Sequence, residues 1–106
     1  MNKNNLDFKD WGCEQSYSNC DIPPKAPGVY AITRPDPESG NPVKEVLYIG
    51  MSKNLYSRTK GHPIFAIAKK KFGYIRMHFL ETPQFIKLEK ELIKKYQPLY
   101  NKTGLK

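Results

Sequence analysis

A glutamate lies among apolar side chains on a helix expected near the C-terminal end of the sequence. On a helical wheel for residues 85–96, Phe85, Leu92 and Tyr96 form one apolar arc, and Glu89 falls inside that arc. A carboxylate on a core-facing side loses hydration, which costs several kcal/mol unless a cation or hydrogen-bond donors replace the water. An internal salt bridge to an arginine, a bound metal ion and a catalytic role therefore all stay open for Glu89.

A second group of polar residues follows an apolar run in residues 45–62, EVLYIGMSKNLYSRTKGH. Arg58 and His62 are four residues apart and come soon after Tyr48. This spacing puts two side chains on one face of a continuing helix, but Pro63 biases the preceding residue away from helical geometry. We therefore expect His62 just past a helix end.

Two strands and a third, separate strand are the elements that would position these residues. The runs GVYAIT (28–33) and VLYIG (46–50) are β-branched and aromatic, and they predict a hairpin with a long loop. In residues 74–81 the side chains alternate, which predicts a strand with one face on the core. The core face holds Ile75, Met77 and Phe79, and the other face holds Tyr74, Arg76 and His78.

Helices are expected between and after these strands. Ser52 is a good N-cap for residues 53–60, Pro63 can begin a helix that Gly73 ends, and Thr82 can cap a last helix that stops before Pro98. The order β-β-α-α-β-α predicts an α/β fold in which helices flank a small, three-stranded mixed or antiparallel sheet. We expect one domain at 27–106, preceded by a polar lead-in at 1–26.

The chain is strongly basic. Its 18 Lys and Arg residues exceed its 10 Asp and Glu residues, giving a net charge of +8 and a pI near 9.5. Such an excess favours a polyanionic partner, most often nucleic acid, although a solvated basic surface would have the same composition. The candidates for contact with a nucleic-acid backbone are Lys69, Lys70, Lys71, Arg76 and His78.

Neither a membrane span nor a secretory signal is visible. No window approaches the roughly 18 apolar residues of a span, and the N-terminal MNKNNLDFKD lacks the apolar core of a signal peptide. We expect an intracellular protein, in the cytoplasm or nucleoid, without membrane contact. Cys13 and Cys20 are most simply free thiols there, and their role stays open.

Five short motifs together resemble the GIY-YIG nuclease superfamily. They are GVY at 28–30, YIG at 48–50, the following SKNLYSR, EKELI at 89–93 and YN at 100–101. Val29 stands where the family name has isoleucine, which exchanges one β-branched residue for another. The tripeptides alone are common, but five elements in the family's order make a specific match.

The resemblance implies a compact nuclease domain that hydrolyses a phosphodiester, with DNA as substrate and one Mg²⁺ or Mn²⁺ ion as cofactor. It implies that Tyr30 and Tyr48 are the motif tyrosines, Arg58 the motif arginine, Glu89 the metal ligand and Asn101 the late motif asparagine. His62 matches a histidine that only some branches of the family have. Within that scheme Arg58 would clamp the phosphate, and we favour Tyr30 as general base with Tyr48 as its positioning partner.

Two other classes of function stay open from the sequence. One is a nucleic-acid-binding module of the same fold that has lost catalysis, and the other is an interaction or inhibitor protein that uses the same positive charge. The intact set of motif residues argues against the first. The sequence does not indicate a preferred DNA sequence or structure, and it leaves a protein partner and the oligomeric state open.

Overall fold

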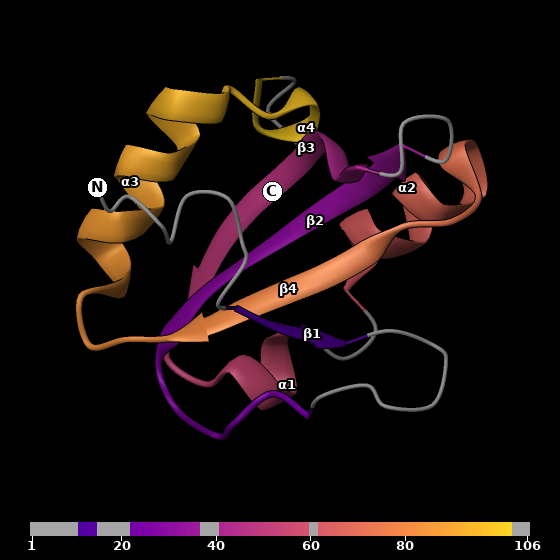
Figure 1. Cartoon of the computed structure of the whole chain (residues 1–106). Helices are drawn as coiled ribbons and strands as arrows, with labels where there is room; N and C mark the ends of the chain where they lie inside the picture. Colours follow the sequence, from indigo (N-terminus) through magenta and orange to yellow (C-terminus); the bar gives the residue numbers. More distant parts are fainter. Residues whose placement is uncertain (1–10, 15–21, 37–40, 60–61, 103–106) are drawn as a thin grey trace.

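An antiparallel sheet forms the centre of the fold. The computed structural model of the chain describes residues 11–14, 22–36, 41–59 and 62–102. Strand β2 (Gly28–Asp36) pairs with β3 (Asn41–Ser52) on one side and with β4 (Arg76–Glu81) on the other. These are the three predicted strands, and they are flanked by helices in the predicted order β-β-α-α-β-α (Figure 1).

A fourth, short strand extends this sheet at one edge. Strand β1 (Gly12–Glu14) pairs antiparallel with β4, so the strand order is β1-β4-β2-β3. The preceding Trp11 is only 6% exposed and packs on the sheet. Both lie within residues 1–26, which were expected to form a polar lead-in, so part of that segment belongs to the sheet.

The first helix begins later than its predicted cap. Helix α1 (Leu55–Thr59) is capped by Asn54, whose Oδ1 accepts from the backbone N–H of Ser57 at 3.2 Å. Ser52, the predicted cap, is the last residue of β3, and its hydroxyl accepts from the N–H of Asn54 at 3.0 Å. The prediction was wrong because β3 runs farther than the apolar pattern indicates, so Ser52 shapes the turn that leads into the helix.

The next helix has its predicted bounds. Helix α2 (Pro63–Phe72) begins at Pro63 and ends at Gly73, which has a φ of 87° and donates its N–H to the carbonyl of Lys69 at 2.9 Å. This left-handed φ favours glycine, because a Cβ is disfavoured there.

The last two helices follow β4. Helix α3 (Phe85–Tyr96) begins just after Gln84, whose N–H donates to the hydroxyl of Thr82 at 3.1 Å. It ends at Gln97 in the left-handed conformation, and the short helix α4 (Leu99–Lys102) follows Pro98.

Both faces of the sheet are covered. Helices α1 and α2 pack with Tyr100 of α4 on the face that carries Tyr30, Ile32 and Met77. Helix α3 packs with Trp11 on the opposite face. The sheet therefore lies between two layers and both of its faces are apolar. None of the helices in the described ranges is long and apolar enough to cross a membrane.

His78 lies on the sheet face that α3 and Trp11 cover, and it is not exposed as expected. This side chain was expected on an outer face with access to nucleic acid, but it is only 4% exposed, and its Nε2 lies 2.8 Å from the hydroxyl of Thr33. Strand β1 pairs alongside it, with Cys13 opposite His78 in the register. Ile75, Met77 and Phe79 are buried as predicted, but the other face is buried at His78 too, so the prediction of His78 as a nucleic-acid contact was wrong.

We predict that His78 makes the fold sensitive to mild acid. Burial, together with nearby Arg76, lowers the pKa of His78 to about 4. Between that value and the unfolded pKa of about 6.5 the unfolded chain binds a proton that the folded chain does not, so stability falls as pH falls. His78 should account for a loss of about 2 kcal/mol between about pH 7 and about pH 5.

Denaturant unfolding of the wild type and of His78→Gln at these two pH values checks this expectation. The glutamine amide can keep a hydrogen bond to Thr33 but does not titrate. The pH dependence of unfolding should therefore shrink in the variant. An equal loss of stability in both proteins would contradict the assignment to His78.

Candidate active site

The hydroxyl group of Tyr30 is the centre of the site. Tyr30 lies on β2 and is 1% exposed. Its oxygen is 2.9 Å from Nε2 of His62 and accepts from Nε of Arg58 at 3.2 Å. Arg58 comes from the last turn of α1, and His62 is the N-cap residue of α2. Three elements therefore meet at one buried phenol.

The hydrogen bonds of His62 define which ring nitrogen carries its proton. The backbone N–H of Ile64 donates to Nδ1 of His62 at 3.1 Å, so Nδ1 is an acceptor. Burial and the charge of Arg58 lower the pKa of His62 to about 4, which keeps the ring neutral at pH 7. The one ring proton is then on Nε2, which donates to Tyr30. The Tyr30 oxygen thus accepts two hydrogen bonds, from Arg58 and from His62.

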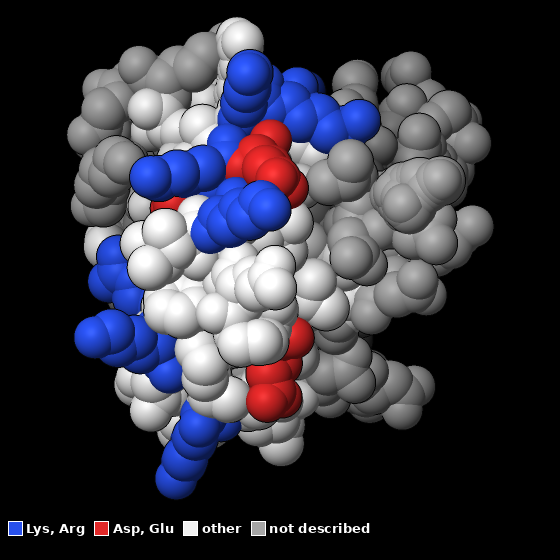
Figure 2. All heavy atoms as spheres, turned by 90° about the vertical axis from the view of Figure 1, so that its left-hand side faces the viewer, with Lys and Arg blue, Asp and Glu red and all other residues white. Residues whose placement is uncertain are grey.

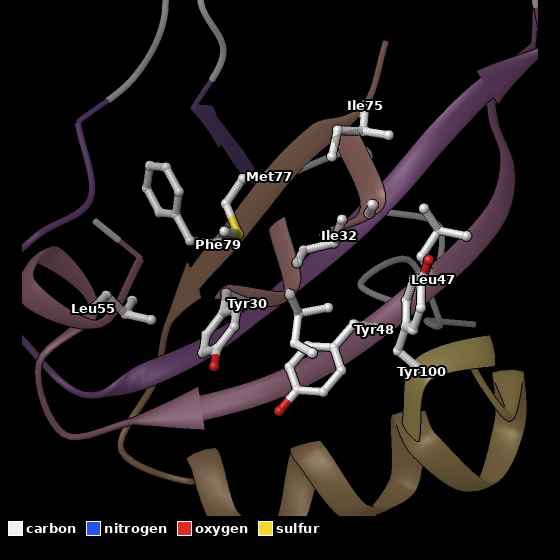
Figure 3. Packing of buried hydrophobic residues seen from close by; sticks show 11 residues of the cluster. Tyr30, Ile32, Leu47, Tyr48, Leu55, Ile75, Met77, Phe79 and Tyr100 are labelled. Atoms are coloured by element: carbon white, nitrogen blue, oxygen red, sulfur yellow. The ribbon is translucent and has the colours of Figure 1, made fainter. Parts of the chain in front are cut away.

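Tyr48 completes a group of three rings. The ring centroids of Tyr30 and Tyr48 are 6.2 Å apart, and the His62 ring is 5.3 Å from the first and 5.5 Å from the second. Figure 3 shows the two tyrosine hydroxyls pointing the same way, out of the apolar cluster. Two phenol oxygens therefore face one side of the molecule.

The protein environment disfavours ionisation of both phenols. Burial raises the pKa of Tyr30 to about 12, Tyr48 adds to the rise, and the hydrogen bond and charge of Arg58 oppose it. Burial also raises the pKa of Tyr48, the charge of Arg58 lowers it, and the charge of Glu89 raises it. Both groups are therefore protonated at neutral pH until more positive charge reaches them.

Gly50 gives the Tyr30 ring its place. A Cβ atom built on Gly50 would lie 2.4 Å from both Cζ and the hydroxyl oxygen of Tyr30. The two residues are direct partners in the β2–β3 register. Any side chain at position 50 would therefore push the phenol away from Arg58 and His62.

Asn101 fixes the edge strand that carries Tyr48 and Gly50. Its Oδ1 accepts from the backbone N–H of Ile49 at 2.8 Å, and its Nδ2 donates to the carbonyl of Ile49 at 3.0 Å. The side chain thus binds β3 in the way that a neighbouring strand would. Because β3 is an edge strand, this pair of bonds satisfies backbone groups that have no strand partner on that side.

Glu89 reaches the same region from α3. It is half-buried, and its charge raises the pKa of Tyr48, so its carboxylate lies close enough to act on that phenol. Within the described ranges, His, Cys, Asp and Glu side chains form no group of three or more that could hold a metal ion. A single carboxylate fits Mg²⁺ or Mn²⁺, since these ions keep most positions for water and phosphate oxygens, and it does not fit zinc.

The basic candidates lie apart from this constellation. Lys69, Lys70 and Lys71 are in the last turn of α2, whose first turn adjoins His62. Arg76 stacks on Tyr74 at the start of β4, with its guanidinium carbon 5.9 Å from the ring centroid. The structure therefore brings together Tyr30, Tyr48, Arg58 and His62, with Glu89 and Asn101 beside them, and leaves these basic residues outside.

Two contributors to the site were not among the sequence candidates. Gly50 was visible in the motif YIG, but its close approach to Tyr30 depends on the register of two strands. The backbone N–H of Ile64 donates to His62. The sequence indicates only that this group lies in the first turn of a helix that begins at Pro63. A glycine opposite a buried tyrosine is the signal that could have identified Gly50.

A compact antiparallel sheet flanked by helices, with two tyrosines, an arginine and a helical glutamate around one point, defines a small α/β domain of nuclease type. A comparison of the sequence with models of known protein families leads to the same class of protein. The model of the GIY-YIG catalytic domain matches residues 26–102, so the chain belongs to the GIY-YIG family, whose members are generally nucleases. Comparisons with curated proteins and with solved structures gave no match.

We predict that Gly50→Ala destabilises the protein through Tyr30. The new methyl group would overlap the phenol, and overpacking of this kind typically costs about 1–3 kcal/mol. The free energy of unfolding of four proteins tests this: wild type, Gly50→Ala, Tyr30→Leu and the double variant. The cost of the alanine should be smaller in the Tyr30→Leu background. If Gly50→Ala lowered the free energy of unfolding equally in both backgrounds, the need for glycine at position 50 would come from a contact other than Tyr30.

Proposed function

We propose that this protein is a divalent-metal-dependent endonuclease that hydrolyses phosphodiester bonds in DNA. The observation that carries the proposal is the double hydrogen bond to the Tyr30 oxygen, from Arg58 and from neutral His62. Two donors on one buried phenol oxygen favour its ionised form and so oppose the rise in pKa that burial causes. An ionised phenol next to an arginine suits general-base catalysis on an anionic substrate.

In the proposed reaction Tyr30 takes a proton from the attacking water. The water oxygen bonds to phosphorus, the bond from phosphorus to the leaving sugar oxygen breaks, and the leaving oxygen acquires a proton from solvent. Arg58 is exposed, its Nε donates to Tyr30, and a side-chain hydrogen bond from it also acts on Tyr48. Its guanidinium group would bind the non-bridging phosphate oxygens beside the two phenols. Tyr48 lies against both Tyr30 and His62 and holds the two rings in position.

Glu89 would hold the Mg²⁺ or Mn²⁺ ion, which supplies positive charge to the phosphate and to the leaving oxygen. Asn101 supports the site indirectly, since it holds the backbone between Tyr48 and Gly50. His62 acts as a positioning residue through its hydrogen bond to Tyr30.

We predict that Glu89→Gln abolishes cleavage of plasmid DNA in Mg²⁺ and leaves the fold intact. Gln preserves size and helix propensity but removes the charge that a metal ion requires. The matched control is Glu91→Gln, the same change at an exposed position of α3. Cleavage by the wild type and by this control should be lost only when EDTA is added.

Thermal melts without metal separate the metal-ligand role of Glu89 from a structural one. Loss of an internal salt bridge would lower stability by several kcal/mol, whereas loss of a metal ligand should leave the metal-free protein as stable as the wild type or slightly more so. A well-folded Glu89→Gln variant that still cleaves DNA would reject the metal-ligand role.

We predict that cleavage under subsaturating DNA becomes faster with rising pH. A base with a raised pKa is ionised in a fraction that grows about tenfold per pH unit below that pKa, so kcat/KM should rise by about that factor between about pH 7 and pH 8. The pKa of Tyr30, about 12 without metal, agrees with this direction. Tyr30→Phe should lose most of the activity, and Tyr74→Phe should keep the wild-type profile. A rate that is independent of pH would contradict Tyr30 as the base.

A further inference from the structure

The position of the reacting phosphate is set by the side chains that surround it. The hydroxyls of Tyr30 and Tyr48 point out of the apolar cluster on one side (Figure 3). Helix α3 contacts β2 and β3, and it carries Glu89, whose charge acts on Tyr48. A DNA strand that places a phosphate at these groups must therefore pass close to α3.

Helix α3 carries a row of exposed lysines. Lys87, Lys90 and Lys94 have the spacing i, i+3, i+7 and fall within about 60° of one another on the helical wheel. None of the three makes an ion pair within the parts of the chain that the structure describes. Their charges are therefore available to an anionic partner.

The length of this row matches a short stretch of DNA backbone. Seven residues of helix rise by about 10 Å, and one strand of duplex DNA has a phosphate every 3.4 Å or so along its axis. The row can therefore span about three phosphates. Figure 2, which looks at the side where α3 lies in Figure 1, shows Lys and Arg side chains around a patch of uncharged residues, with Asp and Glu side chains at two places along its edge.

The surface beside the row suits the sugars of a backbone. A shallow depression of about 440 Å³ is lined by Pro83, Gln84, Ile86, Lys87 and Lys90. Ile86 is 50% exposed, so apolar surface lies directly next to the two lysines. A sugar–phosphate strand alternates apolar sugar faces with anionic phosphates, which complements this arrangement in both polarity and charge.

The lysines of α2 lie in a less favourable place. Helix α2 begins next to His62 and leads away from it, and Lys69, Lys70 and Lys71 are in its last turn. They lie roughly 9–12 Å farther along the helix axis than its first residue, Pro63. Lys71 is also placed over the Phe72 ring, 5.5 Å from its centroid. Figure 1 shows α2 and α3 at opposite ends of the sheet.

We propose that Lys87, Lys90 and Lys94 of α3 are the main contacts to the DNA backbone beside the active site, and that Lys69, Lys70 and Lys71 contribute little. The proposal rests on the nuclease function proposed above. Contacts of this kind position a strand and carry no sequence preference. Helix α3 would then have two functions on different faces. Glu89 faces the active site, and the three lysines face the DNA strand on either side of the reacting phosphate.

Binding of a short fluorescent DNA duplex in EDTA, between about 50 and 200 mM salt, tests this proposal. One variant replaces Lys87, Lys90 and Lys94 with Gln, and its counterpart replaces Lys69, Lys70 and Lys71 with Gln. Both remove the same charge. The slope of log K against log salt should fall by about 3 in the α3 variant and by less than about 1 in the α2 variant, because each phosphate contact contributes about 0.9.

Several results would overturn the proposal. An unchanged slope in the α3 variant would do so, and so would an equal or larger loss in the α2 variant. Thermal melts check that both variants are folded. If the α3 triple variant is not folded, Lys90→Gln alone takes its place, with an expected change in slope of about 1. If the wild type fails to bind duplex DNA at any of these salt concentrations, this inference is rejected, and the plasmid cleavage assay decides the proposed nuclease function separately. If the wild type binds DNA and this binding depends on the lysines of α2, the inference about α3 is rejected and the proposed nuclease function is not.

Discussion

The buried hydroxyl of Tyr30 is the constraint on which the surrounding structure depends. A phenol that is 1% exposed must find hydrogen-bond partners inside the protein, and Arg58 and His62 both donate to its oxygen. One partner lies in the last turn of α1 and the other caps the start of α2, so both helices must be placed beside the first residues of β2. Pro63 helps, since it starts α2 directly after His62 and fixes the first turn whose N–H groups orient the imidazole.

Strand β3, which carries Tyr48 and Gly50, is held by side-chain hydrogen bonds from Asn101. Strand β3 is at the edge of the sheet, where backbone groups lack a strand partner, and Asn101 supplies one donor and one acceptor to Ile49. The neighbours of Ile49 are Tyr48 and Gly50, which respectively face the imidazole and make room for the phenol. A residue more than 50 positions away thus controls how precisely two motif residues are placed, which gives a physical reason for an asparagine late in the chain.

Much of the fold could be predicted because local chemistry determines it. Pro63 and Gly73 bound α2 as expected, and the alternation of Ile75, Met77 and Phe79 identified a strand. What failed depended on distant contacts. His78 was expected to be exposed because the polar, aperiodic N-terminal segment gives no signal for β1, and an anchoring role for Trp11 does not say which face of the sheet it covers. The site residues came from motif order, whereas the hydrogen bond from His62 to Tyr30 spans 32 positions and is invisible in a local pattern.

The electrostatics of the two tyrosines explain why the protein alone is an incomplete catalyst in the proposed mechanism. A pKa about two units above that of free tyrosine means that ionising Tyr30 costs about 3 kcal/mol more than in water, even with Arg58 beside it. The negative charge of Glu89 acts in the same direction on Tyr48. A divalent cation held by Glu89 would reverse the sign of the local field, so that the residue which opposes ionisation in the metal-free protein would promote it once loaded. The base would then be weakly active until the ion is bound, because only that positive charge offsets the effect of burial on the phenol.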